Sequence, residues 1–416
     1  AQPCCCMKDG KNLSGKELIN RMKPITPIVP MSLPDLTDAE REAVLAVLNT
    51  PNLSMGPFID EFEHGLADFI GAKEAIGVNS GTAGLHLCIR AAAVQPGEIV
   101  LTTPFSFVSS TNVILFEHGI PVFVDVDPRT GNMDPELAAQ AIEDLAHGGK
   151  AAQRWLPRRG AQDVGKLKAM LVIDVFGQPA DYDALRPLAK KHNLKLIEDS
   201  CEAFGAEYKG KKVGLEGDYG VFAFYPNKQM TTGEGGMVVT DDSEAAQYMR
   251  ALRNQGRAPG DTWLQHTFLG YNYRLDEMSA ALGVAQLRRI EELLQKRQRV
   301  ADWYADRLGR IPGVEAPFTA PQTTRASWFV YVVRFDPHLN RDVLATRLTA
   351  RGIPVRPYFL PIHLQPYMIE KFGYQPGDFP VTEDLGRRGL ALPFSGMMTE
   401  DQVDLVCHIL AEAIQE

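Results

Sequence analysis

The sequence predicts an α/β protein with a mostly parallel sheet flanked by helices, followed by a smaller α+β domain. Helical stretches such as "YDALRPLAKKHN" separate several short runs that are rich in β-branched and apolar residues. Strands that alternate with helices are typical of parallel sheets covered on both faces. The strand-like runs lie at 74–78, 98–105, 121–127, 169–177, 194–199, 217–226 and 235–242.

Helices are predicted from capping and from the spacing of apolar residues. Thr37 followed by Glu40 forms a capping-box pattern ahead of an apolar stretch, which predicts a helix there. Another helix is predicted from about Thr82. One long amphipathic helix is predicted over roughly 276–300, where Leu282, Leu287, Ile290 and Leu294 fit a helical stripe.

The pattern changes near residue 300, where a strand at 327–335 is followed by helices at 341–352 and 399–415. We therefore expect a large domain over 23–299 and a small C-terminal domain over 300–416. Residues 1–22 are predicted to be a poorly ordered leader or cloning remnant. The cysteine run in that segment lacks the histidine or paired cysteines of a metal site, so no metal is predicted.

The bulk composition excludes several classes of function. The chain has 416 residues and a formal net charge of −9, and it contains no dense Lys/Arg stripe, which argues against nucleic-acid binding. No apolar run is long enough to span a membrane, and no apolar core of a secretory signal is present. Scattered cysteines among apolar neighbours are typical of reduced thiols, so we expect a cytoplasmic protein.

Three local patterns carry candidate chemistry. In "NSGTAGLHL" (79–87), small residues including Ser80, Gly81 and Thr82 lead into a helix whose N-terminus favours a phosphate. Asp199 ends an apolar strand, where ligands bind in open α/β sheets. Lys228 follows a later strand and precedes a glycine-rich turn. Taken singly, these residues also fit an ordinary turn, a helix cap and a solvated surface lysine.

Together the three patterns match what pyridoxal 5′-phosphate requires. Its phosphate binds a helix N-terminus, a carboxylate keeps the pyridine nitrogen protonated, and a desolvated lysine amine forms a Schiff base. The order and spacing of further motifs are more specific than any single one. These are "GPFIDEFE", "NSGTAGLHL", "PFSFVSSTNVILFEHGIPVFVDVD", "FGQPAD", "IEDSCEAFGA", "FYPNKQMTTGEGGMVVTDD", "LGYNYRLDEMSAALG", "PIHLQPY" and "ALPFSGMMTED".

With these motifs the chain resembles the DegT/DnrJ/EryC1/StrS family of sugar aminotransferases, within the fold type I pyridoxal-phosphate superfamily, from about residue 28 to 412. The resemblance implies that Lys228 is the Schiff-base lysine and proton shuttle, and that Asp199 pairs with the pyridine nitrogen. It further implies phosphate donors at Gly81, Thr82 and Ala83, ring stacking on Phe107, and a substrate mouth lined by Tyr358 and His363. Asn272 would reach the phosphate in the neighbouring subunit, so that a homodimer shares its active sites.

Two positions depart from the family pattern. Glu202 stands where a glutamine is usual near the phenolic oxygen of the cofactor. A charged carboxylate would repel that oxygen, so Glu202 is expected to be protonated or turned away. Ala223 stands where a phosphate-binding serine is usual, five residues before the lysine, so another group or water must replace that hydroxyl.

The sequence therefore predicts a homodimeric aminotransferase that moves an amino group from glutamate or glutamine to a keto group of a nucleotide-linked sugar. The reaction would be ping-pong through the lysine Schiff base. A cyclitol aminotransferase of the scyllo-inosose type in an antibiotic pathway is an alternative. A non-catalytic regulator that binds pyridoxal phosphate is another, although the chain has no spare length for a DNA-binding module.

Overall fold

The computed structural model describes residues 28–161 and 163–416. The predicted leader, residues 1–22, lies outside the described residues. No helix in the described part of the chain has both the length and the apolar character needed to cross a membrane.

A seven-stranded sheet forms the centre of the fold, in the order β1-β9-β8-β5-β4-β2-β3. Strand β9 runs antiparallel to both of its neighbours, and every other neighbouring pair is parallel. The predicted mostly parallel sheet is confirmed. The strands are β1 (Glu74–Val78), β2 (Ile99–Thr102), β3 (Ile120–Phe123), β4 (Leu167–Ile173), β5 (Lys195–Asp199), β8 (Tyr219–Ala223) and β9 (Gly236–Thr240).

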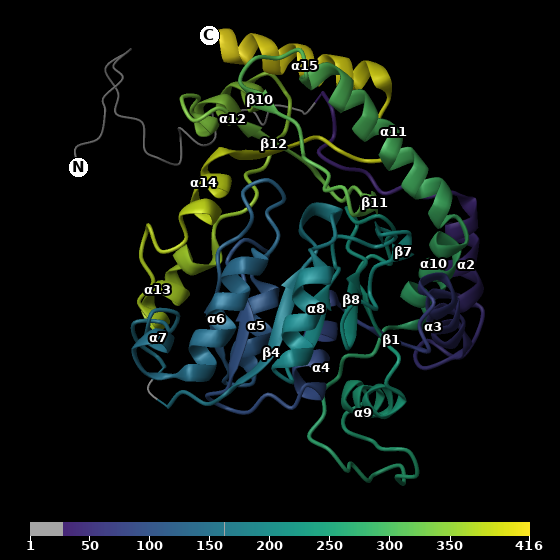
Figure 1. Cartoon of the computed structure of the whole chain (residues 1–416). Helices are drawn as coiled ribbons and strands as arrows, with labels where there is room; N and C mark the ends of the chain where they lie inside the picture. The colour runs from purple at the N-terminus through teal and green to yellow at the C-terminus, as the bar shows by residue number, and fades with distance from the viewer. Residues whose placement is uncertain (1–27, 162) are drawn as a thin grey trace, which may run out of the picture.

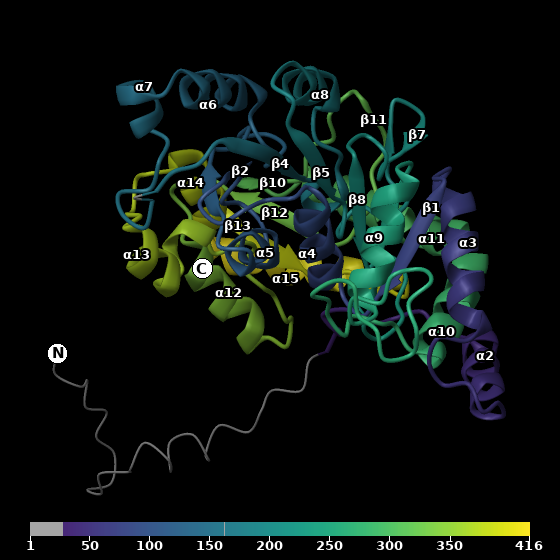
Figure 2. The same cartoon turned by 90° about the horizontal axis from the view of Figure 1, so that it is seen from below.

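Helices cover both faces of this sheet, as Figure 2 shows. Helices α6 (Pro135–His147) and α8 (Tyr182–Lys191) pack on one face, while α4 (Gly81–Ala91), α5 (Ser109–Phe116) and α9 (Ser243–Arg253) pack on the other. Because alternate side chains of a strand point to opposite faces, a strand buried on both sides must be apolar throughout. In β4, Met170 belongs to one core and Leu171 to the other.

A second, smaller core is built around an antiparallel sheet of β10 (Val314–Glu315), β12 (Tyr331–Phe335) and β13 (Gly389–Leu392). Figure 1 shows it above the large sheet, beneath α15 (Glu400–Gln415). The other elements are α2 (Asp38–Leu48), α3 (Pro57–Ile70), α7 (Gly149–Gln153), α12 (Arg341–Ala350), α13 (Pro366–Phe372), α14 (Pro380–Arg388), β6 (Glu207–Tyr208), β7 (Lys211–Lys212) and β11 (Thr323–Arg325).

The prediction of one helix over 276–300 is wrong, because two helices occupy this region. Helix α10 (Glu277–Arg288) ends before Arg289, and α11 (Ile290–Leu308) begins after it. Arg289 leaves helical geometry with φ −113° and ψ 16°. Its guanidinium group donates to Glu40 and Asp35 in the segment that precedes and opens α2. Such a long-range ion pair is not visible in helical periodicity.

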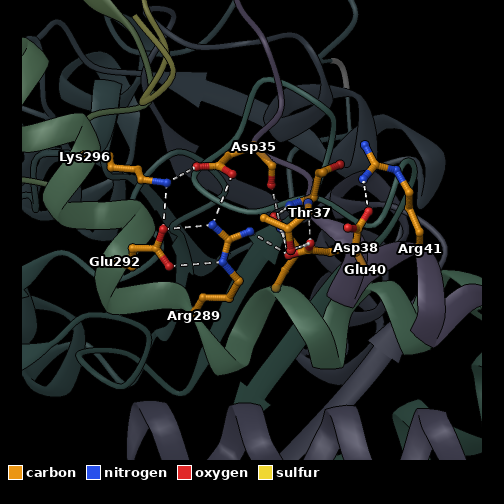
Figure 3. Close-up of polar contacts among 10 residues, drawn as sticks. Asp35, Thr37, Asp38, Glu40, Arg41, Arg289, Glu292 and Lys296 are labelled. Carbon is orange, nitrogen blue, oxygen red and sulfur yellow. Dashed lines mark hydrogen bonds and ion pairs between the residues drawn. The ribbon is translucent and has the colours of Figure 1, made fainter.

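Figure 3 shows how charged side chains tie this N-terminal segment to the α10–α11 junction. Asp35 accepts hydrogen bonds from Lys296 at 2.6 Å and from Arg289 at 3.1 Å. Glu40 accepts from the backbone N–H and the hydroxyl of Thr37, both at 2.6 Å, as the predicted capping pattern requires. Burial raises the pKa of Glu40, but the bonds from Thr37, Gln286 and Arg289 outweigh it and lower the pKa to about 2.

Replacing Glu40 should therefore destabilise the protein in a pH-dependent way. A carboxyl whose pKa is lower in the folded state stabilises that state at pH values above its ordinary pKa of 4.5. This stabilisation is lost as the pH falls towards about 2. We expect Glu40→Gln to lower the free energy of unfolding by about 2–3 kcal/mol at neutral pH. The deficit should shrink steadily below about pH 5.

Chemical denaturation of both proteins across this pH range measures the effect. Glu42→Gln, an exposed change on the same helix, is the matched control and should leave stability unchanged. A Glu40→Gln deficit that stays constant down to acid pH would contradict the assignment.

Candidate active site

A cavity opens at the edge of the sheet where the parallel strands end. Its lining comes from the turns that follow β1, β2, β4, β5 and β8, because the carboxyl ends of parallel strands meet at one edge. Phe329, Tyr358 and Phe359, from the segments on either side of β12, line another part of its wall. The lining residues are Ser80, Gly81, Thr82, Ser106, Phe107, Ser109, Ile173, Asp199, Cys201, Glu202, Ala223, Tyr225, Asn227, Lys228, Glu234, Gly235, Phe329, Tyr358 and Phe359.

The N-terminus of α4 forms one end of the cavity. Ser80 caps the helix and accepts the N–H of Ala83 at 3.1 Å. Within the described residues, the N–H groups of Gly81 and Thr82 meet no acceptor, so both are available to an anion. Gly81 must lack a side chain, because a Cβ there would lie 2.8 Å from Ala223 Cβ and 2.9 Å from Cys201 Sγ.

Asp199 is the last residue of β5 and is buried beside the cavity. Its Oδ1 accepts the N–H of Cys201 at 3.2 Å. Burial raises the pKa of Asp199, while the bonds from Cys201 and the charge of Lys228 oppose that rise. Its neighbour Glu198 points to the other face of the sheet, where it accepts N–H groups from Gly214 and Glu216. Only Asp199 of these two acids is directed to the cavity.

Lys228 also lines the cavity. It closes the turn that begins at Tyr225, because its N–H donates to Tyr225 O at 2.9 Å. Its Nζ lies 3.7 Å from the centroid of the Phe329 ring and 3.9 Å from Glu202 Oε1. The side chain is 13% exposed, so the amine is not the solvated surface group that the sequence left open. A desolvated amine that faces a cavity is placed to act as a nucleophile.

Glu202 also lines the cavity. One carboxylate oxygen accepts the N–H of Phe176 at 2.9 Å, and the other faces Lys228. Burial raises the pKa of Glu202, against the charge of Lys228 and the Phe176 bond. The side chain is therefore not turned away from the cavity, and burial shifts its pKa upward, in the direction of the protonated form. Ala223 also lines the cavity, and its methyl side chain supplies no hydroxyl group there.

Three of the predicted site residues do not line the cavity. Ala83 is buried behind Ser80, which occupies its N–H. Asn272 is exposed in the loop between α9 and α10. His363 is fully buried, with Nε2 3.0 Å from Glu383 Oε1 and its ring packed against Phe379. The structure does not bring His363 to the predicted substrate mouth, whereas Tyr358 from the same segment does line it.

Sequence reasoning missed the contribution of Phe329. It lies in "SWFVYVVRF", a pattern that predicts only a strand, yet strand β12 begins two residues later. The continuous apolar run at 328–333 gives no sign that this residue faces Lys228 rather than a core. Tyr225 and Asn227 were also missed, although their positions next to Lys228 in the same turn could have indicated them. Residues 28–161 and 163–416 contain no cluster of metal-ligating side chains.

Comparison with known proteins gives the family. Residues 34–411 match the model of the DegT/DnrJ/EryC1/StrS aminotransferase family. A GDP-perosamine synthase from Caulobacter vibrioides is 37% identical over 93% of this chain and 99% of its own length. A dTDP-3-amino-3,4,6-trideoxy-alpha-D-glucose transaminase from Streptomyces venezuelae is 33% identical over 90% of this chain and 92% of its own length.

Solved structures agree with this result. The crystal structure of S. venezuelae DesV in complex with a ketimine intermediate superposes with a TM-score of 0.82 at 31% identity, covering 94% of this chain and 100% of that one. The chain belongs to the DegT/DnrJ/EryC1/StrS aminotransferase family, and it is an aminotransferase. The predicted family and fold class are both confirmed.

Removing the charge at Glu202 should stabilise the cofactor-free protein at neutral and higher pH. A carboxyl whose pKa is raised by folding costs stability once pH exceeds its unfolded pKa, because ionisation is then easier in the unfolded chain. Glu202→Gln keeps an oxygen for the Phe176 N–H. We expect its melting temperature to exceed that of wild type near pH 8 and the two to converge towards pH 4. A variant that is less stable than wild type at pH 8 would show that Glu202 is held as the charged form.

Proposed function

We propose that this chain is a pyridoxal-phosphate-dependent aminotransferase that moves an amino group from glutamate or glutamine to a keto group of a nucleotide-linked sugar. The observation that carries the proposal is the convergence of the α4 N-terminus, Asp199 and Lys228 on one cavity. The names of the two relatives, a GDP-perosamine synthase and a dTDP-linked amino-sugar transaminase, support the substrate class.

The residues around the cavity fit pyridoxal 5′-phosphate, the cofactor of this aminotransferase. The unpaired N–H groups of Gly81 and Thr82 would bind its phosphate. Asp199 would accept a hydrogen bond from its ring nitrogen, and Phe107 would cover one face of the ring. When bound, the cofactor supplies an electron sink for the bonds broken at the amino-acid Cα.

Lys228 would have two tasks. Its amine would hold the cofactor covalently, and, once released by the amino donor, it would move the proton from the donor Cα. Asp199 would keep the ring nitrogen protonated, since a buried carboxylate is stabilised by a cation at hydrogen-bonding distance. Phe329, Tyr358 and Phe359 would keep water from the side of the cavity that the small domain covers.

The proposed homodimer follows from the loop between α9 and α10, which projects beyond α9 in Figure 1. Asn272 is exposed there between Tyr271 and Tyr273, whose rings stack with centroids 4.9 Å apart. Tyr273 OH lies 2.9 Å from His86 Nδ1 on α4, and Arg90 of the same helix donates to Tyr271 OH at 2.6 Å.

The same loop exposes large apolar side chains, with Trp263 at 76%, Leu264 at 82% and Leu269 at 81%. Apolar side chains gathered in this way usually mark an interaction surface. A second copy of the chain would cover them and would receive Asn272 at its own phosphate site.

Covalent labelling tests the assignment of Lys228. Borohydride reduction of the holoenzyme followed by peptide mapping should place a phosphopyridoxyl group on Lys228, because that amine faces the cavity. Lys228→Ala should still bind cofactor but lose turnover by several orders of magnitude. A label on any other lysine would reject the assignment.

The substrate class is tested with wild-type enzyme and a panel of nucleotide keto-sugars and cyclitol ketones. Glutamate and glutamine serve as amino donors, and products are identified by mass spectrometry. Amination of a nucleotide keto-sugar is the expected result. Amination of cyclitol ketones alone would contradict the proposed substrate while leaving the aminotransferase chemistry intact.

Mixing two inactive variants tests the shared site. In a heterodimer of Lys228→Ala and Asn272→Asp chains, one site carries both defects and the other carries neither. The acidic replacement is chosen because a carboxylate repels a phosphate. Random assortment should restore about a quarter of wild-type activity, since half of the dimers are mixed and each has one intact site.

Exchange of subunits is verified with differently tagged chains. Exchange without recovered activity, from an inactive Asn272→Asp parent, would place Asn272 in the site of its own subunit.

A further inference from the structure

Arg297 lies where the two cores of the protein meet. Helix α11 packs Ile290, Leu293 and Leu294 into the core of the large sheet, and Val300, Ala301 and Tyr304 into the smaller core. Figure 1 shows this helix running from α10 up to α15. Arg297 is 4% exposed, on the stretch of α11 between these two sets of residues.

Among residues 28–161 and 163–416, the guanidinium group of Arg297 donates hydrogen bonds to backbone carbonyl groups alone, and its Cζ lies 5.8 Å from the centroid of the Phe394 ring. Nη1 donates to Trp328 O at 3.1 Å and to Phe329 O at 3.3 Å. Nη2 donates to Asn227 O at 3.1 Å and also to Lys228 O. No carboxylate in the described part of the chain forms an ion pair with it. The nearby acid Asp35 is held by Lys296 and Arg289 instead.

The charge of Arg297 persists despite this burial. Burial lowers the pKa of Arg297 to about 10, which leaves the group protonated at neutral pH. A buried cation without an acidic partner is costly, and the four carbonyl dipoles offset that cost. The planar fork of an arginine can serve two backbone segments at once, which the single ammonium of a lysine does less well.

Arg297 binds two backbone segments, and both of them carry residues of the contact between Lys228 Nζ and the Phe329 ring. One is the turn of Asn227 and Lys228, and the other is the linker that carries Phe329, whose ring centroid lies 3.7 Å from Lys228 Nζ. Gln229 adds a second connection, since its amide donates to Ser327 O at 2.8 Å. Both partners of the Lys228–Phe329 contact are therefore fixed at their backbones by one guanidinium group.

We propose that Arg297 is a positioning residue that holds the Lys228 turn against the Phe329 linker and so sets where the lysine amine lies in the cavity. The proposal rests on the function proposed above for Lys228. Arg297 does not line the cavity, and it acts through the backbone carbonyl groups that it binds. A shift of about 1 Å in a reacting group can reduce a rate on the order of a hundredfold.

The test measures how fast the amine of Lys228 condenses with an aldehyde in cofactor-free protein. Wild type, Arg297→Met and Arg297→Lys are incubated with pyridoxal, which lacks the phosphate and so reports on the lysine rather than on the α4 site. Reduction with borohydride at intervals and mass spectrometry of the Lys228 peptide give the rate of condensation. Circular dichroism establishes that each variant is folded. Arg299→Met, an exposed change two residues away on α11, is the matched control.

We expect the rate at Lys228 to fall on the order of a hundredfold in Arg297→Met, to recover partly in Arg297→Lys, and to equal wild type in Arg299→Met. If Arg297→Met does not fold, the decrease in folded Arg297→Lys decides the question. A wild-type rate in a folded Arg297 variant would overturn the proposal and leave the function of Lys228 intact. If Lys228 of the wild type is not labelled at all, the proposed function is overturned instead, and the positioning role with it.

Discussion

The site depends on one constraint, which is that the carboxyl ends of parallel strands meet at a single edge of the sheet. Strands β1, β2, β4, β5 and β8 all point the same way, so the turns after them share one cavity. Asp199 ends β5 and Lys228 lies in the turn after β8, and each reaches the cavity because of this direction. The antiparallel β9 lies between β1 and β8, and its Gly236 packs against the backbone of Ser80. A side chain at that glycine would come within 2.7 Å of the Ser80 carbonyl and would disturb the start of α4.

The charges inside the cavity suit a ligand with one anionic end and one cationic atom. The N–H groups of Gly81 and Thr82 at the α4 N-terminus have no acceptor in the described part of the chain and can bind an anion. Burial raises the pKa values of both Asp199 and Glu202. Lys228 is the cation that faces these two acids. A carboxylate with a raised pKa gains stability from a cationic partner, so a protonated ring nitrogen beside Asp199 would relieve its burial. Glu202 already uses one oxygen for the Phe176 N–H, which limits the direction in which it can turn.

The region where the two cores meet contacts the Lys228 turn through backbone carbonyl groups rather than through side chains in the cavity. Helix α11 belongs to both cores, and adjacent residues on it bind two different segments. Lys296 holds Asp35 of the N-terminal segment, and Arg297 holds the Lys228 turn together with the Phe329 linker. This arrangement gives a physical reason for a buried arginine without an acidic partner.

The sequence alone determined the class of fold, the strand end that carries Asp199, the turn that carries Lys228, and the glycine-containing start of α4. These features follow from local periodicity and from motifs whose order along the chain is specific. Tertiary structure decided the rest. It divided the expected helix over 276–300 at Arg289, because that side chain pairs with Asp35 and Glu40 far away in sequence. It buried His363 against Glu383, and it brought Phe329 to Lys228. Such contacts join residues about 20 to 250 positions apart, and a local pattern cannot encode them because it does not record which surfaces will meet.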